Sequence, residues 1–113
     1  MDLQTALSLY GKAGTVFIDA RRSDAFRAGH IEGARHIPYS FVEPLAKESV
    51  ENLRSSKTVI VYCNREDSEA SKLLAGEFAQ AGIKGVFYLD KGFAGWVKAR
   101  GRYAGKPPEG YDE

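Results

Sequence analysis

Residues 58–69, TVIVYCNREDSE, run from an apolar segment through a cysteine into a polar loop. Residues 59–62 are apolar and mostly β-branched, which predicts a strand buried in the centre of a sheet. Helical periodicity begins after the polar residues, so Cys63 is expected at the C-terminal end of a strand, facing a helix N-terminus. There the helix dipole and free backbone N–H groups stabilise a thiolate, which is the reactive form of cysteine.

Cys63 is the only cysteine of the chain, so it cannot form an internal disulfide. A lone cysteine is most often a small apolar residue of the core. Its position at the mouth of the predicted strand, rather than within it, favours a functional thiol. The residues alone leave both interpretations open.

The composition predicts one soluble globular domain, because the chain has 113 residues, 43% of them hydrophobic and 27% charged. A formal net charge of +1 gives no reason to expect nucleic acid or an anionic membrane as a partner. The N-terminus shows no basic region followed by an apolar segment, and no apolar run approaches the length of a membrane span. We therefore expect a cytoplasmic protein, or a domain of a longer one.

Predicted strands and helices alternate along the chain. Strands are expected at residues 15–18, 36–37, 58–62 and 86–89. Helices are expected at residues 3–10, 23–28, from 41 onward, 50–53, 70–81 and 93–99. This alternation predicts an α/β fold with a mostly parallel central sheet and helices on both faces. A single domain should cover residues 1–103, and the Gly, Pro and charged residues of 104–113 predict a loosely held C-terminal tail.

The carboxyl edge of such a sheet is where ligands bind. Asp19 follows the first predicted strand, and Cys63 follows the central one. Both residues should therefore lie at one edge, which is the expected place for an active site.

Four motifs make the chain resemble a known family, the rhodanese-like (sulfurtransferase) domain, over nearly its whole length. They are Ile18-Asp19-Ala20-Arg21, the run Gly29-His30-Ile31-Glu32-Gly33-Ala34 followed by His36-Ile37-Pro38, the strand that leads to Cys63, and Leu89-Asp90-Lys91-Gly92-Phe93 followed by Trp96. Their order and spacing match the family. The resemblance implies the rhodanese-like α/β fold.

The resemblance also implies a sulfur-transfer mechanism. Cys63 would attack the sulfane sulfur of thiosulfate or of a persulfide, hold it as a persulfide, and pass it to a thiol or to cyanide. The implied partners are small sulfur donors and acceptors, and a protein persulfide is a further one. No metal or organic cofactor is implied, since the sequence shows no Cys/His spacing of a metal site.

The loop after the cysteine departs from the family pattern. Six-residue loops of the family commonly end in Arg, whereas the sixth residue here is Ser68. A loop two residues longer, with Ser71 at the helix start, fits better. The loop residues expected to bind substrate are Asn64, Arg65, Glu66, Asp67, Ser68 and Glu69. Because this set has one cation and three carboxylates, it should repel dianionic thiosulfate and make that activity weak.

Three residues near the predicted site are expected to be structural. Asp19 and Arg21 should tie the end of the first strand to neighbouring backbone. His30 should anchor its turn, since sulfur transfer offers no obvious proton for it to move. Tyr62 is expected as a strand residue whose hydroxyl finds a partner, and Trp96 as part of the core.

Two other classes of function stay open at this stage. One is a non-enzymatic rhodanese-like module that binds partners or senses sulfur or oxidants; the acidic loop favours it and the retained Cys63 argues against it. The other is a Cys-dependent phosphatase or arsenate reductase. That chemistry needs an Arg that binds the oxyanion at the position where this chain has Glu69.

Overall fold

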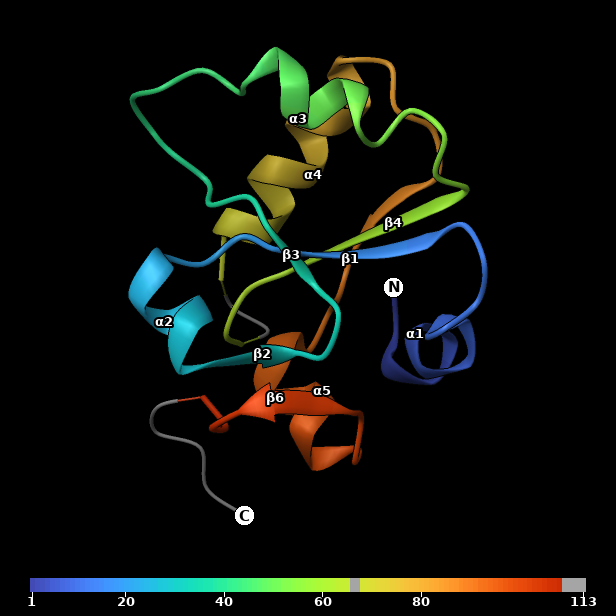
Figure 1. The fold of residues 1–113 in the computed structure, drawn as a ribbon, viewed down its shortest axis with the longest axis vertical. Coiled ribbons are helices and arrows are strands. Elements are labelled where there is room, and N and C mark those ends of the chain that lie inside the picture. Colours follow the sequence, from blue (N-terminus) through green and yellow to red (C-terminus); the bar gives the residue numbers. More distant parts are fainter. Residues whose placement is uncertain (66–67, 109–113) are drawn as a thin grey trace.

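Helices and strands alternate along the chain, as the sequence predicts (Figure 1). The computed structural model describes residues 1–65 and 68–108. The elements are α1 (Leu3–Leu9), β1 (Thr15–Asp19), α2 (Ser23–Ala28), β2 (Gly29–Ile31), β3 (Arg35–His36), α3 (Lys47–Glu51), β4 (Thr58–Tyr62), α4 (Ala70–Gln80), β5 (Val86–Tyr88), α5 (Gly92–Lys98) and β6 (Tyr103–Gly105).

The main sheet has four strands in the order β3-β1-β4-β5, and every neighbouring pair is parallel. Strands β1 and β4 lie in the middle. Their register pairs Val16 with Val59 and Asp19 with Tyr62, so the two central strands end together. The predicted α/β fold with a mostly parallel sheet is confirmed.

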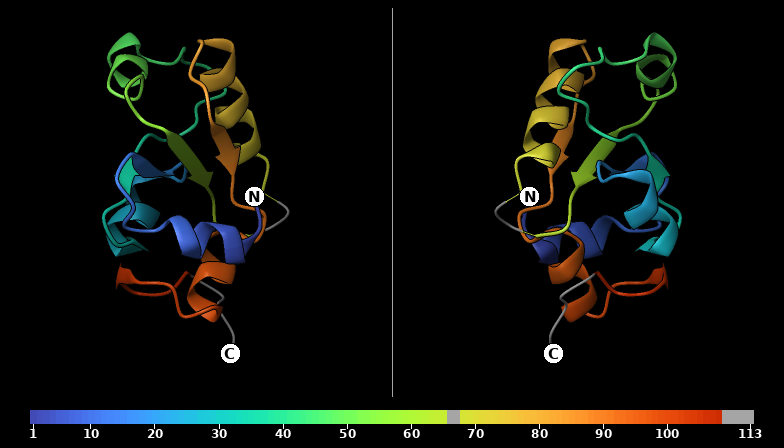
Figure 2. Two further views of the ribbon diagram at one scale, coloured as in Figure 1. Left: turned by 90° about the vertical axis from the view of Figure 1, so that its right-hand side faces the viewer. Right: turned by 90° about the vertical axis from the view of Figure 1, so that its left-hand side faces the viewer.

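Side-chain alternation along β4 explains why helices cover both faces of the sheet. Val59 and Val61 face a core formed with α3 and α4, where Phe78 is fully buried. Ile60 and Tyr62 face a second core, formed with α1 and α5. Figure 2 shows α3 and α4 on one side of the strands and α1 and α5 on the other. A strand buried on both sides needs the continuous apolar run that residues 59–62 supply.

A second, two-stranded sheet was not predicted. Strand β2 pairs antiparallel with β6, with His30 opposite Ala104. The N–H of Lys106 also donates to the carbonyl of Ala28 at 2.9 Å. Residues 104–106 are therefore paired along the backbone, although the sequence suggests a loose tail from residue 104. Residues 109–113 of that expected tail lie outside the described residues, and the domain boundary stays a prediction.

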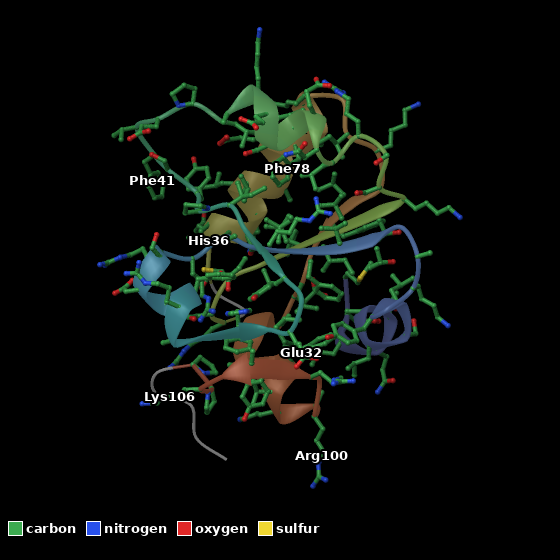
Figure 3. All side chains as sticks on the ribbon, viewed as in Figure 1. Glu32, His36, Phe41, Phe78, Arg100 and Lys106 are labelled. Carbon is green, nitrogen blue, oxygen red and sulfur yellow. The ribbon has the colours of Figure 1, made fainter. Side chains whose placement is uncertain are left out.

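The segment between β3 and α3 differs from its sequence-based prediction. The helix expected from Phe41 does not form, and α3 begins at Lys47 rather than at residue 50. The Ser40 hydroxyl instead accepts bonds from the N–H groups of Val42 and Glu43, which closes a turn. A proline at position 44 disfavours helix in the residue before it, which explains the difference. Phe41 is 81% exposed and lies on the outer side of this loop (Figure 3).

Within the described part of the chain, none of the helices is both long and apolar enough to span a membrane.

Candidate active site

The ends of β1 and β4 place Cys63 at the carboxyl edge of the sheet. The N–H of Ala20 donates to the carbonyl of Tyr62 at 2.9 Å, which continues the pairing of β1 and β4 to the last residue before the cysteine. Cys63 comes next and is half-buried. The predicted location of the cysteine at a strand end is confirmed, and its side chain is neither deep in the core nor fully in solvent.

The start of α5 holds the backbone at the cysteine. The N–H of Phe93 donates to the carbonyl of Cys63 at 2.8 Å, and the N–H of Ala94 donates to the carbonyl of Asn64 at 2.9 Å. The first amides of a helix have no partner within the helix, so they are free to bind the neighbouring loop. The Cys63–Asn64 segment is thus fixed through both of its carbonyls.

Gly92 allows this close approach. Its φ is +65°, a left-handed conformation that favours glycine. A Cβ at this position would lie 2.8 Å from the carbonyl oxygen of Cys63 and 2.8 Å from the amide nitrogen of Arg65. Any side chain at position 92 would therefore push against the backbone of the loop.

A buried polar network lies beneath the loop. Asp19 is fully buried and forms a salt bridge with Arg21, with 2.8 Å between Oδ2 and Nη2. The Tyr62 hydroxyl donates to the same carboxylate oxygen at 2.7 Å and accepts from the N–H of Ile31 at 3.0 Å. The expectation that the Tyr62 hydroxyl finds a partner is confirmed, and among the described residues no buried side-chain nitrogen or oxygen lacks a hydrogen-bond partner.

Burial and charge shift the pKa values of this network. Burial raises the pKa of Tyr62, and the negative charge of Asp19 raises it further. Burial acts to lower the pKa of Arg21, but the hydrogen bond and the charge of Asp19 outweigh it, so the pKa rises. Arg21 thus keeps its positive charge, and Tyr62 remains a neutral hydrogen-bond donor, across the physiological pH range.

Arg21 connects this network to the loop. Its Nη1 donates to Oδ1 of Asn64 at 2.9 Å, and its guanidinium lies over the ring of Phe93, with 4.7 Å from Cζ to the ring centroid. The carbonyl of Gly29 accepts another bond from Nη2. Arg21 therefore contacts both the residue after the cysteine and the residue whose N–H binds the cysteine carbonyl.

The other described residues of the expected substrate loop are Arg65, Ser68 and Glu69. The N–H of Ser68 donates to the carbonyl of Arg65 at 3.2 Å, and Arg65 is exposed. Glu69 is exposed and occupies the N-cap of α4 without a side-chain capping bond. The helix begins at Ala70, one residue before the expected Ser71. Glu66 and Asp67, which the sequence also suggests for substrate binding, lie outside the described residues.

His30 is engaged by its own turn. Its Nδ1 lies 2.8 Å from the carbonyl of Phe26, and its ring stacks on that of Phe26 with 4.1 Å between centroids. These contacts are those of an anchor, and the structural role of His30 stays a prediction. In the described part of the chain no group of three or more His, Cys, Asp or Glu residues could hold a metal ion.

Two features of the site were not recognised in the sequence. The sequence shows a glycine in the turn before Trp96, but it does not show that this glycine, Gly92, packs against the backbone of the cysteine loop. The bond from Arg21 to Asn64 joins residues far apart in the chain, and the sequence carries no signal for it.

Comparisons with known proteins identify the family. The rhodanese-like domain matches residues 2–99. The thiosulfate sulfurtransferase GlpE of Pseudomonas putida strain GB-1 is 32% identical over 110 residues, which cover 97% of this chain and 92% of the relative.

Two solved structures share the fold. The BH2092 protein of Bacillus halodurans has a TM-score of 0.80 and 26% identity, covering 93% of this chain and 75% of the other. RPA3614 of Rhodopseudomonas palustris CGA009, described as a possible tyrosine phosphatase, has a TM-score of 0.71 and 24% identity, covering 91% of this chain and 82% of the other. At that identity the second likeness bears on the fold alone. With the family match over nearly its whole length, this chain belongs to the rhodanese-like domain family.

Proposed function

We propose that this protein is a rhodanese-type sulfurtransferase whose nucleophile is Cys63. The observation that carries the proposal is the placement of the chain's single cysteine, half-buried at the carboxyl edge of the sheet, on a backbone segment fixed by the start of α5. Similarity to a thiosulfate sulfurtransferase along the whole chain supports the same activity.

The proposed reaction has two steps. The thiolate of Cys63 attacks the sulfane sulfur of thiosulfate; a new S–S bond forms, the S–S bond of the donor breaks, and sulfite leaves with the electron pair. Cyanide or a thiolate then attacks the outer sulfur of the persulfide. Thiocyanate or a new persulfide leaves, and the Cys63 thiolate is restored, so no external oxidant, reductant or cofactor is consumed.

The charge near the site favours a persulfide over thiosulfate as the sulfur donor. Glu69 stands exposed at the N-cap of α4, beside the loop that a donor must approach. Its negative charge repels a dianion more strongly than an uncharged sulfur compound. We therefore propose slow turnover with thiosulfate and faster sulfur uptake from a persulfide or trisulfide.

A Cys63→Ser variant tests the proposal. The wild type should form thiocyanate from thiosulfate and cyanide, and the variant should not exceed the rate without enzyme. Because the side chain is half-buried and the two residues are similar in size, the variant should fold like the wild type, which circular dichroism checks. Incubation with donor should add about 32 Da to the wild type, removable by dithiothreitol and absent from the variant.

Each result separates the proposal from its alternatives. Equal turnover by the variant would show that Cys63 is not the nucleophile. A wild type that gains no sulfur from any donor would instead point to a non-enzymatic module. A phosphatase would hydrolyse an aryl phosphate, but the exposed carboxylate of Glu69 stands where that reaction needs an Arg.

A further inference from the structure

We infer that Arg21 is a positioning residue for the reaction of Cys63, acting through the side chain of Asn64. This inference rests on the proposed function, because it assigns a role within that same site. It goes beyond the structural role expected for Arg21, since it predicts an effect on the rate of the reaction and not only on the stability of the fold.

The guanidinium of Arg21 is held rigidly. Its side chain is almost fully buried, and Nε and Nη2 both bind the carboxylate of Asp19, at 3.0 Å and 2.8 Å for the shortest pairs. Nη2 also binds the carbonyl of Gly29. These bonds leave Nη1 pointing to Asn64 Oδ1 at 2.9 Å. A planar fork can serve all of these acceptors at once, whereas the ammonium group of a lysine cannot reach them together.

The Cys63–Asn64 segment is consequently held from two sides. The amides of Phe93 and Ala94 bind its two carbonyls, and Arg21 binds its one side-chain amide oxygen. Arg21 also lies over the ring of Phe93, so the two supports contact each other. The residue directly after the nucleophile is therefore fixed in both backbone and side chain by the ends of β1 and α5.

This arrangement matters because sulfur transfer requires an in-line approach of the thiolate to the sulfane sulfur. Misplacement of a reacting atom by about 1 Å can cost about a hundredfold in rate. Arg21 is already neutralised by Asp19, so its loss should disturb the geometry of the cysteine more than the binding of an anion. We expect kcat to fall while KM for the donor changes little.

A double-mutant cycle on the full chain tests this role. The variants are Arg21→Lys, Asn64→Leu and the two combined, with Arg22→Lys as a matched control because the neighbouring arginine is exposed. Thiosulfate:cyanide transfer gives kcat and KM. Alkylation of Cys63 by iodoacetamide gives a second readout that does not depend on sulfur transfer, and hydrogen exchange reports on the amides of Phe93 and Ala94.

The inference predicts that each single substitution lowers kcat by about tenfold with KM within about twofold of the wild type. It also predicts faster hydrogen exchange at the amides of Phe93 and Ala94. The double variant should be no slower than the worse single variant, because both substitutions remove the same hydrogen bond between Arg21 and Asn64. Arg22→Lys should behave as the wild type. Should Arg21→Lys not fold, Asn64→Leu must still show the kcat loss and the faster exchange.

Multiplicative losses in the double variant would overturn the inference, since they would show that Arg21 and Asn64 act separately. So would an unchanged kcat and an unchanged alkylation rate in folded Asn64→Leu. A wild type without sulfur-transfer activity would refute the proposed function instead. In that case the alkylation rates of Cys63 test the positioning role. The role then requires that the double variant changes the alkylation rate no more than the worse single variant does.

Discussion

Replacement of Gly92 by alanine should disturb the backbone at the base of the cysteine loop. Gly92 has a φ of +65°, and its added Cβ would lie 2.8 Å from the Cys63 carbonyl oxygen, the Asn64 carbonyl carbon and the Arg65 amide nitrogen. All three are backbone atoms, which cannot rotate away as the end of a flexible side chain can. Either the loop or the start of α5 must move.

The expected size of the effect follows from two terms. The left-handed φ costs a residue with a Cβ about 1–2 kcal/mol. The displaced backbone adds about 1–3 kcal/mol, the usual cost of overpacking. Gly92→Ala should therefore lower the free energy of unfolding by about 2–5 kcal/mol, a large share of the roughly 5–15 kcal/mol of a typical domain.

Gly11→Ala is the matched control. Gly11 has a φ of +79°, but its Cβ would meet nothing within 4 Å, so it should lose only the conformational term of about 1–2 kcal/mol. Urea unfolding followed by the fluorescence of Trp96 gives both losses, and thiocyanate formation gives the activity. The activity of folded Gly92→Ala should fall while that of Gly11→Ala is retained. Equal losses of stability in the two variants, with equal activity, would refute the reasoning.

Three further variants test the description of the fold and the site. Tyr62→Phe removes the bonds to Asp19 and Ile31 and should cost about 2–4 kcal/mol in urea unfolding. The pKa of Tyr62 is raised in the folded state, so the stability that its hydroxyl contributes is complete below about pH 10. At higher pH this stability is lost, because the unfolded chain releases the phenolic proton first. The wild type should therefore lose stability more steeply than Tyr62→Phe above about pH 10. Phe78→Ala should lower the free energy of unfolding by about 3–5 kcal/mol, since Phe78 is fully buried, with kcat of the folded variant unchanged; a loss under 1 kcal/mol would contradict the packing described for α4. Glu69→Gln should speed the reaction with thiosulfate by about threefold at low salt, leave an uncharged trisulfide unaffected, and lose its advantage at high salt, whereas an equal effect on both donors would exclude a role for charge.

The sequence predicts the parts of the fold whose pattern is continuous. The apolar run of residues 59–62 has the length and composition of a strand buried on both faces, and it became β4 with the predicted bounds. The apolar stripe after the polar loop became α4, which ends one residue earlier than predicted. From these two elements the position of Cys63 follows, because it is the first residue after β4.

The missed elements depend on contacts between distant residues. Strands β2 and β6 are three residues each and contain glycines, so neither has a strand pattern of its own, and only their mutual pairing defines them. The helix expected from Phe41 failed for a local reason, the proline at position 44, whose effect the capping signal of Ser40 does not outweigh. The network of Asp19, Arg21 and Tyr62 was expected only in outline, because a sequence does not show which acceptor a buried donor reaches.

The bonds from Phe93 and Ala94 to the cysteine loop join parts of the chain that are made at different times. During synthesis, β4 and Cys63 are translated and emerge from the ribosome before α5, and β6 follows later still. A nascent chain therefore carries its thiol without the support that the finished protein gives it, because domains complete their folding only as their last elements emerge. In the interval between the emergence of Cys63 and that of α5, the cysteine loop lacks the bonds from Phe93 and Ala94, and a pause in translation there would lengthen this interval.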